Sequence, residues 1–227
     1  MCGRFVLAAS PEALERLLDV PVPEEWARPR YNIAPSQPVL ACRLSSAQER
    51  ELVPLRWGLV PRWARDPAVG NRMINARAET AAEKPAFRAA VRARRCLVPA
   101  DGFYEWSGGA GGRQPYLFRA PGGEPFAFAG LWERWRPPET DEDAAIETCA
   151  ILTRPADEVV GAVHPRMPVI VPPGLFERWL DPSRPGTELL AELVAAPPPL
   201  ALQRVPVSRR VNDPRHDDPS CIEPLPG

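Results

Sequence analysis

The sequence has few of the side chains that bind metal ions. It contains only two histidines, His164 and His216, and five cysteines. The cysteines stand far apart, without a C-x-x-C pair, at Cys2, Cys42, Cys96, Cys149 and Cys221. Zinc sites and disulfide frameworks need closely spaced or evenly paired cysteines. We therefore expect no metal, no cofactor and a reducing, cytoplasmic environment.

Long hydrophobic runs are missing as well. No apolar stretch approaches the roughly 18 residues of a membrane-spanning helix, so we expect no membrane partner. The first residues lack the basic and apolar regions of a secretory signal. Hydrophobic residues make up 44% of the chain, and no linker-like stretch divides it. These features predict one domain, residues 1–227.

Proline is unusually common, with 31 residues, and predicts many loops and short strands. Strands are expected at 37–44, 52–60, 96–106, 116–119, 124–135, 148–153, 167–171 and 200–207. Helices are expected after Ser10, at 85–95, before His164, and at 175–180 and 187–195. The glycine-rich stretch 108–112 is interpreted as a hairpin loop. Because strands dominate and no βαβ alternation is visible, the predicted fold class is α+β.

Basic residues are concentrated in one part of a chain whose net charge is only −1. Between Arg56 and Arg95 there are ten basic residues and three acidic ones, and nearly all of the basic residues are arginine. A local excess of about seven positive charges suits a phosphate backbone. It equally suits a solvated surface that pairs with acids elsewhere in the fold, and charge alone does not decide between the two.

Residue 2 is a cysteine, which would carry both a free α-amine and a thiol if Met1 were removed. The amine of such a residue condenses with an aldehyde to an imine, and the sulfur then closes a thiazolidine ring. Reference pKa values near 8 for the amine and about 8.5 for the thiol leave a useful fraction of each reactive at neutral pH. Gly3 has no side chain to obstruct a reacting partner.

Several short segments are rich in polar and aromatic groups without an obvious role in folding. They are 30–35 (RYNIAP), 57–63 (WGLVPRW), 75–80 (NARAET), 100–106 (ADGFYEW) and 164–168 (HPRMP). Together with the start MCGRF and the segment 218–224 (DPSCIEP), they resemble the SOS response-associated peptidase (SRAP) family of abasic-site processing proteins. The resemblance covers essentially the full length.

The resemblance implies a mostly antiparallel, barrel-like β core with peripheral helices in a single SRAP-type domain. It also implies that Cys2, exposed by removal of Met1, captures the aldehyde of an abasic site in single-stranded DNA as a thiazolidine. Such a covalent DNA–protein crosslink protects the lesion during the SOS response. Thiol autopeptidase and lyase-like activities, a monomeric state and a place at the bacterial nucleoid belong to the same expectation.

Four residues match the catalytic positions of this family. Cys2 matches the nucleophile, and Asn75 matches the amide that binds near the Cys2 amine and the opened sugar. Glu105 matches the acid and base, and His164 matches a second proton-transfer group. Each of the last three also has a structural interpretation: a turn cap, a partner for arginine, and a histidine of the core.

Six further residues match positions near the DNA: Arg4, Pro35, Trp63, Arg77, Lys84 and Thr153. Arg4 and Arg77 match residues that grip phosphates, whereas Pro35 and Trp63 match an apolar wedge beside unstacked bases. The segment 153–157 (TRPAD) departs from the family pattern, and only its threonine is kept. Trp57 and Trp106 are expected in the core.

Three alternative functions stay open. An N-terminal-nucleophile amidohydrolase also begins Met-Cys-Gly, but its glutamine-binding motifs are not visible here. A general thiol peptidase needs an internal nucleophile that survives processing. A non-catalytic module for single-stranded DNA would leave Glu105 and His164 without a function.

Overall fold

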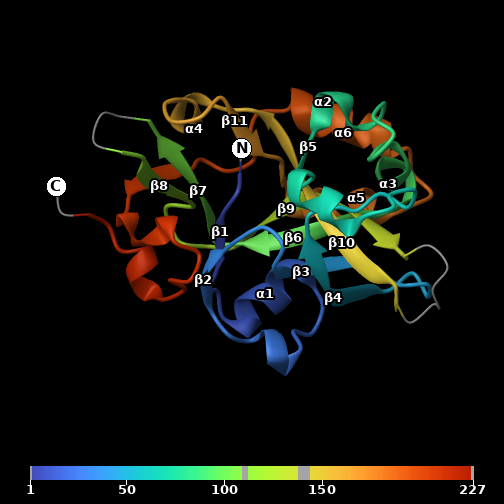
Figure 1. Cartoon of the computed structure of the whole chain (residues 1–227), viewed down its shortest axis with the longest axis horizontal. Helices are drawn as coiled ribbons and strands as arrows, with labels where there is room; N and C mark the ends of the chain where they lie inside the picture. Colours follow the sequence, from blue (N-terminus) through green and yellow to red (C-terminus); the bar gives the residue numbers. More distant parts are fainter. Residues whose placement is uncertain (1, 109–111, 138–143, 226–227) are drawn as a thin grey trace.

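A closed β-barrel lies at the centre of the computed structural model, which describes residues 2–108, 112–137 and 144–225 (Figure 1). Its strands are β3 (Pro38–Leu44), β4 (Arg50–Trp57), β6 (Arg95–Ala100), β9 (Phe126–Trp135) and β10 (Ile146–Pro155). They pair in the order β10–β4–β3–β6–β9, and a further β9–β10 pairing closes the ring. All of these pairings are antiparallel except β4–β10. Closure leaves these strands without a free edge.

Three short strands extend the barrel: β5 (Asn75–Arg77), β11 (Arg166–Pro168) and β12 (Ile170–Val171). β5 runs parallel to β10, so that Asn75 lies opposite Ile151, and β11 pairs with the end of β10. β12 pairs with β9. The β5 strand therefore carries the predicted residues Asn75 and Arg77 to the rim of the barrel.

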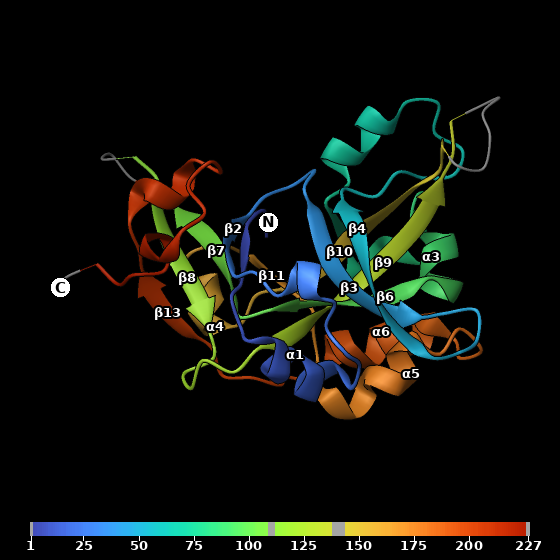
Figure 2. The same ribbon diagram turned by 90° about the horizontal axis from the view of Figure 1, so that it is seen from below.

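A second, fully antiparallel sheet lies beside the barrel, in the order β13–β8–β7–β1–β2 (Figure 2). Its strands are β1 (Phe5–Leu7), β2 (Arg30–Ile33), β7 (Gly102–Ser107), β8 (Gln114–Arg119) and β13 (Gln203–Pro206). In both views the segment that leads into β1, drawn in blue, lies between this sheet and the barrel. The first residues of the chain are thus held where the two sheets meet.

Aromatic packing fixes that segment. The Phe5 ring packs edge-on against Trp57 of the barrel, with a centroid distance of 5.2 Å, and against Phe128 at 5.9 Å. All three side chains are fully buried. Each such pair contributes about 0.5–1.5 kcal/mol beyond the buried area. The position of Cys2, three residues before Phe5, is therefore defined by the core.

The helices lie outside the barrel, as expected (Figure 1). They are α1 (Pro11–Leu18), α2 (Ala78–Ala81), α3 (Arg88–Ala93), α4 (Glu158–Gly161), α5 (Phe176–Leu180) and α6 (Gly186–Ala195). The 3₁₀ turns are η1 (Glu24–Trp26), η2 (Pro67–Arg72), η4 (Pro173–Leu175), η5 (Arg209–Asn212) and η6 (Pro219–Cys221). Ser10 caps α1 by accepting a hydrogen bond from the Ala13 amide at 3.3 Å, which satisfies one of the free N–H groups of the first turn. None of the described helices is long and apolar enough to cross a membrane.

The predicted α+β fold with a mostly antiparallel, barrel-like core and peripheral helices is confirmed. The stretch 96–106, however, is not one strand. It divides at Asp101 into β6 of the barrel and β7 of the second sheet, because the Asp101 carboxylate accepts hydrogen bonds from the amides of Ala8 and Ala9. Strands β1, β2 and β5 were not predicted. Of the expected hairpin loop, residues 109–111 lie outside the described residues, whereas Ser107 and Gln114 on either side of it pair antiparallel.

The basic segment also differs from the expectation. Arg95 is buried in the core, where its guanidinium donates to main-chain carbonyls, including that of Trp179 at 2.5 Å. Arg94 donates to the nearly buried carboxylate of Glu133 at 2.7 Å. These two of the ten basic residues hold the fold together and are not available to a phosphate. The predicted helix 85–95 is correspondingly short, because Arg95 already belongs to β6.

Candidate functional site

The four predicted catalytic residues come from four separate parts of the fold and meet at the start of the chain. Cys2 precedes β1, Asn75 begins β5, Glu105 lies in the middle of β7 and His164 follows α4. The Asn75 side-chain amide donates to the Cys2 carbonyl at 2.7 Å. His164 Nδ1 lies 3.8 Å from Glu105 Oε1, and the Glu105 charge acts on the Cys2 thiol. The barrel thus contributes Asn75, and the second sheet contributes Glu105.

The surroundings of Cys2 favour the thiol form of its side chain over the thiolate. Its side chain is fully buried, and this burial, together with the nearby Glu105 charge, raises the pKa of the Cys2 thiol far above its ordinary value. Its Sγ lies 3.9 Å from the Arg4 carbonyl. Burial thus opposes the formation of a thiolate at Cys2, whereas the sequence led us to expect a ready fraction of thiolate once Met1 is removed.

Glu105 is the buried acid of the site, with only 3% of its surface exposed. Burial raises the pKa of Glu105, and the positive charge of a protonated His164 acts in the opposite direction. His164 is partly exposed, and both the amide nitrogen and the carbonyl oxygen of Arg166 lie 3.1 Å from its Nδ1. The backbone therefore orients the imidazole in either protonation state.

Asn75 carries the most informative polar atom of the site. Its Nδ2 is used by the Cys2 carbonyl, but its Oδ1 is buried without a hydrogen-bond partner among the described residues. A buried carbonyl oxygen in this state costs about 1–3 kcal/mol. Unsatisfied groups of this kind are rare in native folds and commonly belong to functional sites. The Oδ1 atom is an acceptor that a bound molecule would satisfy.

Four of the six predicted DNA-contact residues lie at least partly at the surface. Trp63, in the loop after β4, is 63% exposed, an unusual state for a large aromatic side chain. Arg77 is exposed at the end of β5, two residues after Asn75. Its guanidinium forms no ion pair with a described residue, and its charge contributes to the lowered pKa of Glu79. Lys84 is exposed after α2, and Pro35 is half-buried after β2. These side chains are accessible to a ligand.

The other two residues are used by the fold. Thr153 is fully buried in β10, and its hydroxyl donates to the Ala76 carbonyl at 3.4 Å. The side chain of Thr153 is thus used within the fold, and the prediction that this position contacts DNA stays a prediction. The half-buried Arg4 donates through Nη1 to Asn32 Oδ1 at 2.7 Å and to the Val211 carbonyl at 2.8 Å. The Nη1 group of Arg4 is thus used for hydrogen bonds within the protein.

The two tryptophans that were expected in the core differ from each other. Trp57 is fully buried, as predicted, and its Nε1 donates to the Ile74 carbonyl at 2.9 Å. Trp106 is only half-buried and lies at an edge, where its Nε1 donates to Asn212 Oδ1 at 2.6 Å. Trp106 is therefore a surface aromatic group close to the start of the chain.

Sequence reasoning missed one residue that shapes the site. Asn32 is fully buried, and its Nδ2 lies within hydrogen-bond distance of the carbonyls of Val211, Asp213 and His216 at 2.6–3.2 Å. It thereby holds the segment around η5 against Arg4. The only available signal was its position inside the RYNIAP segment.

Two polar pockets open at the surface of the described structure. The first, which we name the N-terminal pocket, has a volume of about 330 Å³ and begins one residue after Cys2. Its lining residues are Gly3, Arg4, Trp106, Arg113 and Asn212. Arg4 lies over the Trp106 ring at 5.8 Å, a cation–π arrangement, and Arg113 is exposed without an ion pair to any described residue.

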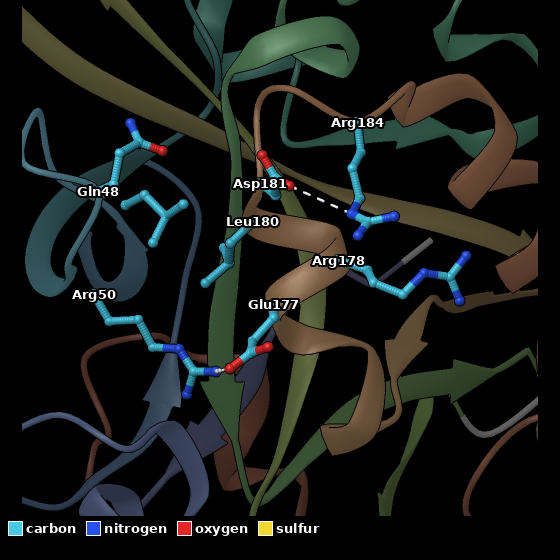
Figure 3. A pocket seen from close by; sticks show the side chains of 8 residues that line it. Gln48, Arg50, Glu177, Arg178, Leu180, Asp181 and Arg184 are labelled. Carbon is cyan, nitrogen blue, oxygen red and sulfur yellow. Dashed lines mark ion pairs between the residues drawn. The ribbon is translucent and has the colours of Figure 1, made fainter.

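The second, which we name the α5 pocket, lies between the β3–β4 turn and α5, with a volume of about 310 Å³ (Figure 3). Its lining residues are Leu44, Gln48, Arg50, Glu177, Arg178, Leu180, Asp181 and Arg184. Arg184 pairs with Asp181 at 3.3 Å, and Arg50 lies 3.9 Å from Glu177. Arg178 pairs with a glutamate of α6 at 2.8 Å. Every arginine here already has a carboxylate partner.

No group of three or more histidine, cysteine, aspartate or glutamate side chains within residues 2–108, 112–137 and 144–225 could hold a metal ion. The residues of the site are those of acid–base and nucleophilic chemistry: a thiol, a buried carboxyl, an imidazole and an amide.

A family model described as SOS response associated peptidase (SRAP) matches residues 1–214. The chain is 38% identical over 226 residues to abasic site processing protein YoqW of Bacillus subtilis (strain 168), covering 98% of this chain and 99% of that protein. It is 34% identical over 236 residues to abasic site processing protein HMCES of Gallus gallus, covering 88% of this chain and 69% of that protein. A crystal structure of a protein from Bacteroides thetaiotaomicron matches with a TM-score of 0.83 at 25% identity, covering 99% of this chain and 100% of that one. The motifs, the fold and these matches agree, and the chain belongs to the SOS response-associated peptidase family.

Proposed function

We propose that this chain captures abasic sites in single-stranded DNA covalently, through a thiazolidine formed by Cys2 after Met1 has been removed. The observation that carries the proposal is the arrangement around Cys2. The Asn75 side chain donates to the Cys2 carbonyl, and its buried Oδ1 has no hydrogen-bond partner among the described residues. The charge of Glu105 acts on the Cys2 thiol. The names of the relatives YoqW and HMCES, both abasic site processing proteins, support the same substrate.

The first step needs an acid, and Glu105 is suited to supply it. The free amine of Cys2 adds to the aldehyde carbon of the ring-opened sugar, and the resulting hydroxyl must leave as water to give a protonated imine. Because burial raises the pKa of Glu105, a larger fraction of this carboxyl is protonated near neutral pH than for an exposed glutamate. It can donate the proton to the departing hydroxyl.

The second step needs a base, and the same carboxyl can serve again. After donating its proton, Glu105 is a carboxylate next to a thiol whose pKa is raised by burial. It accepts the thiol proton while the sulfur adds to the carbon of the protonated imine and closes the ring. One C–N bond and one C–S bond form, one water leaves, and Glu105 ends in its initial protonation state.

His164 and Asn75 complete the proposed site. His164 is partly exposed and lies beside Glu105, so it can exchange protons with solvent and assist the opening of the sugar. Asn75 Oδ1 is placed to accept a hydrogen bond from the freed amine or from a sugar hydroxyl, which would remove its unsatisfied state.

Binding of the DNA strand is assigned to the exposed residues. Arg77 and Lys84 supply positive charge, and Trp63 and Pro35 supply apolar surface beside the bases. Arg4 contributes the guanidinium nitrogens that do not take part in its hydrogen bonds to Asn32 and Val211. We further propose that the chain acts as one SRAP domain over residues 1–227, as a monomer, at the bacterial nucleoid. Thiol autopeptidase and lyase-like activities are part of this proposal.

The proposal is tested by incubating the protein with a single-stranded oligonucleotide that contains one abasic site. Denaturing electrophoresis should show a covalent band for the parent and none for Cys2→Ala, while non-covalent binding by Cys2→Ala persists. Cys2→Ser should give no durable band, since a hydroxyl closes the ring poorly. A form that retains Met1 should fold but not crosslink. A band of equal strength with Cys2→Ala would assign the reaction to another nucleophile.

A further inference from the structure

The N-terminal pocket is not used by the chemistry at Cys2. Glu105 and Trp106 are neighbours on β7, so their side chains project to opposite faces of the sheet. Glu105 points toward Cys2, whereas Trp106 lines the pocket. Gly3 is the residue that links the two regions, because it lines the pocket and directly follows Cys2. A glycine at this rim leaves the backbone open to close approach.

The lining of the pocket combines an aromatic surface with uncompensated positive charge. The indole of Trp106 is half-buried and held in place by Asn212 at 2.6 Å. Arg4 is fixed over the ring by its hydrogen bonds, and Arg113 stands exposed at the entrance. An aromatic face with nearby guanidinium groups is the combination that binds a base and its phosphate in single-stranded nucleic acids. The volume of about 330 Å³ falls within the range of small-ligand sites.

We propose that the N-terminal pocket is a nucleotide subsite that receives a nucleotide flanking the abasic site, with its base stacked on Trp106 and its phosphate at Arg113. The inference rests on the proposed function, because only a DNA strand anchored at Cys2 would pass over Gly3 into the pocket. A base on one side of the lesion therefore contributes to recognition, although the lesion itself has none.

The α5 pocket shows why the N-terminal pocket is preferred. Both contain arginines, but each arginine of the α5 pocket is paired with a carboxylate. Figure 3 shows the pairs of Arg50 and Arg184. A phosphate there would have to displace an acid. In the N-terminal pocket the charge of Asp213 acts on Arg4, and Asp213 is itself held by Arg215 at 2.6 Å; no described carboxylate forms an ion pair with Arg4.

The experiment measures binding in the Cys2→Ala protein, so that it does not depend on crosslinking. Fluorescence anisotropy would compare an oligonucleotide that has bases on both sides of the lesion with two others. In each of these, one flanking nucleotide is replaced by a tetrahydrofuran spacer without a base. We expect one of the two spacers to weaken binding about 5- to 150-fold, the range of one base–aromatic stack.

Repeating the titrations with Trp106→Leu in the Cys2→Ala protein completes a double-mutant cycle, in which one change is the spacer in the oligonucleotide and the other is the substitution of Trp106. The spacer penalty should disappear in Trp106→Leu and persist in Trp106→Tyr, which keeps an aromatic ring. Thermal unfolding of each variant establishes that it is folded. An equal spacer penalty in Cys2→Ala with and without Trp106→Leu, or no penalty in either, would overturn the subsite.

Arg113→Ala should reduce the slope of log binding constant against log salt by about 0.7, the value for one phosphate contact on a single strand. The matched control is Arg178→Ala in the α5 pocket, for which the slope should not change. Identical slopes for Arg113→Ala and Arg178→Ala would overturn the phosphate contact. Failure of the proposed function has a different signature, the lack of a covalent band with the Cys2 parent.

Discussion

The N-terminal pocket and the α5 pocket have similar volumes, about 330 and 310 Å³. Two arginines line the first and three line the second, but the partners of those arginines differ. In the α5 pocket each guanidinium faces a carboxylate. In the N-terminal pocket Arg4 faces an amide, a carbonyl and an indole, and Arg113 faces solvent. Surface ion pairs stabilise a fold by about 1 kcal/mol or less, yet they neutralise a site for other anions. The number of arginines is therefore a poor guide to an anion site, and their partners are a better one.

The largest effect on reactivity is expected from Glu105→Gln, which tests whether the region around Cys2 depends on a proton-transfer group. The variant loses the proton donor and acceptor of both proposed steps, so crosslinking should slow about 10²- to 10⁴-fold. The rate of the parent should fall as pH rises through the raised pKa of Glu105, since the acid form is lost. The variant should lack this decline, as followed by band intensity against time from pH 5 to 9.

Stability gives an independent check of the same carboxyl. Because folding raises the pKa of Glu105, its contribution to stability is fully present below the ordinary glutamate pKa and is lost as pH rises through the folded value. The free energy of unfolding of Glu105→Gln, compared with that of the parent, should therefore increase with pH. The charge of a protonated His164 lowers the pKa of Glu105 and so reduces this trend. If the difference in free energy of unfolding between Glu105→Gln and the parent is the same at all pH values, the pKa of Glu105 is not raised by folding.

Behind the α5 pocket, Arg95→Met should cause the largest loss of stability, about 3–5 kcal/mol. The Arg95 guanidinium donates to the carbonyls of Asp181 and Arg184 in the wall of this pocket, and to Trp179 in the core. Its removal leaves several buried carbonyls without donors. Urea unfolding measures the change, and Arg92→Met, at an exposed position of the preceding helix α3, should stay within about 0.5 kcal/mol of the parent. A loss of similar size for both variants would contradict this assignment.

On the face of the predicted DNA path, Trp63→Ala should weaken binding to single-stranded DNA by about 1–3 kcal/mol, the contribution of one stacked base. The change should leave the unfolding midpoint nearly unaltered, because the side chain is 63% exposed. Leu225→Ala, which truncates another exposed apolar side chain, 38% exposed, is the control. If both variants bind alike in anisotropy titrations, Trp63 is not on the path.

The smallest effect is expected from Arg77→Ala, which should lower the salt slope of DNA binding by about 0.7 and weaken all single-stranded sequences similarly. Arg77 is exposed and unpaired within the described part of the chain, whereas Arg184 is paired with Asp181. Arg184→Ala should therefore leave the slope unchanged. A lower slope for Arg184→Ala would show that an ion-paired arginine can still serve a phosphate.

Local sequence signals were sufficient for much of the fold. Alternating apolar residues predicted most strands of the barrel, and Ser10 followed by Pro11 predicted the start of α1. Strands β1, β2 and β5 were not predicted, because each has only three or four residues and exists through long-range pairing, such as that of Asn75 with Ile151. Sequence periodicity carries little information about such partners.

The candidate site was found by resemblance, but its physical state required the structure. That Cys2, Asn75, Glu105 and His164 lie together follows from the family pattern, whereas the burial that raises the pKa of the Cys2 thiol does not. The burial of Thr153 and Arg95 was missed for a related reason. Polar and charged residues are usually exposed, and only tertiary contacts reveal the few that the core retains.

The reactive end of the chain is completed by residues that the ribosome adds late. Arg4 binds the carbonyl of Val211, 207 residues further along, and Asn32 holds the same carbonyl. The Asp217 carboxylate accepts from the amide of Asn32 at 2.9 Å and secures the segment. At roughly 5–20 residues per second, about 10–40 s pass between synthesis of the nucleophile and synthesis of this wall. Under the proposed function, a nascent polypeptide lacks the complete site, and only completed molecules would capture an abasic site.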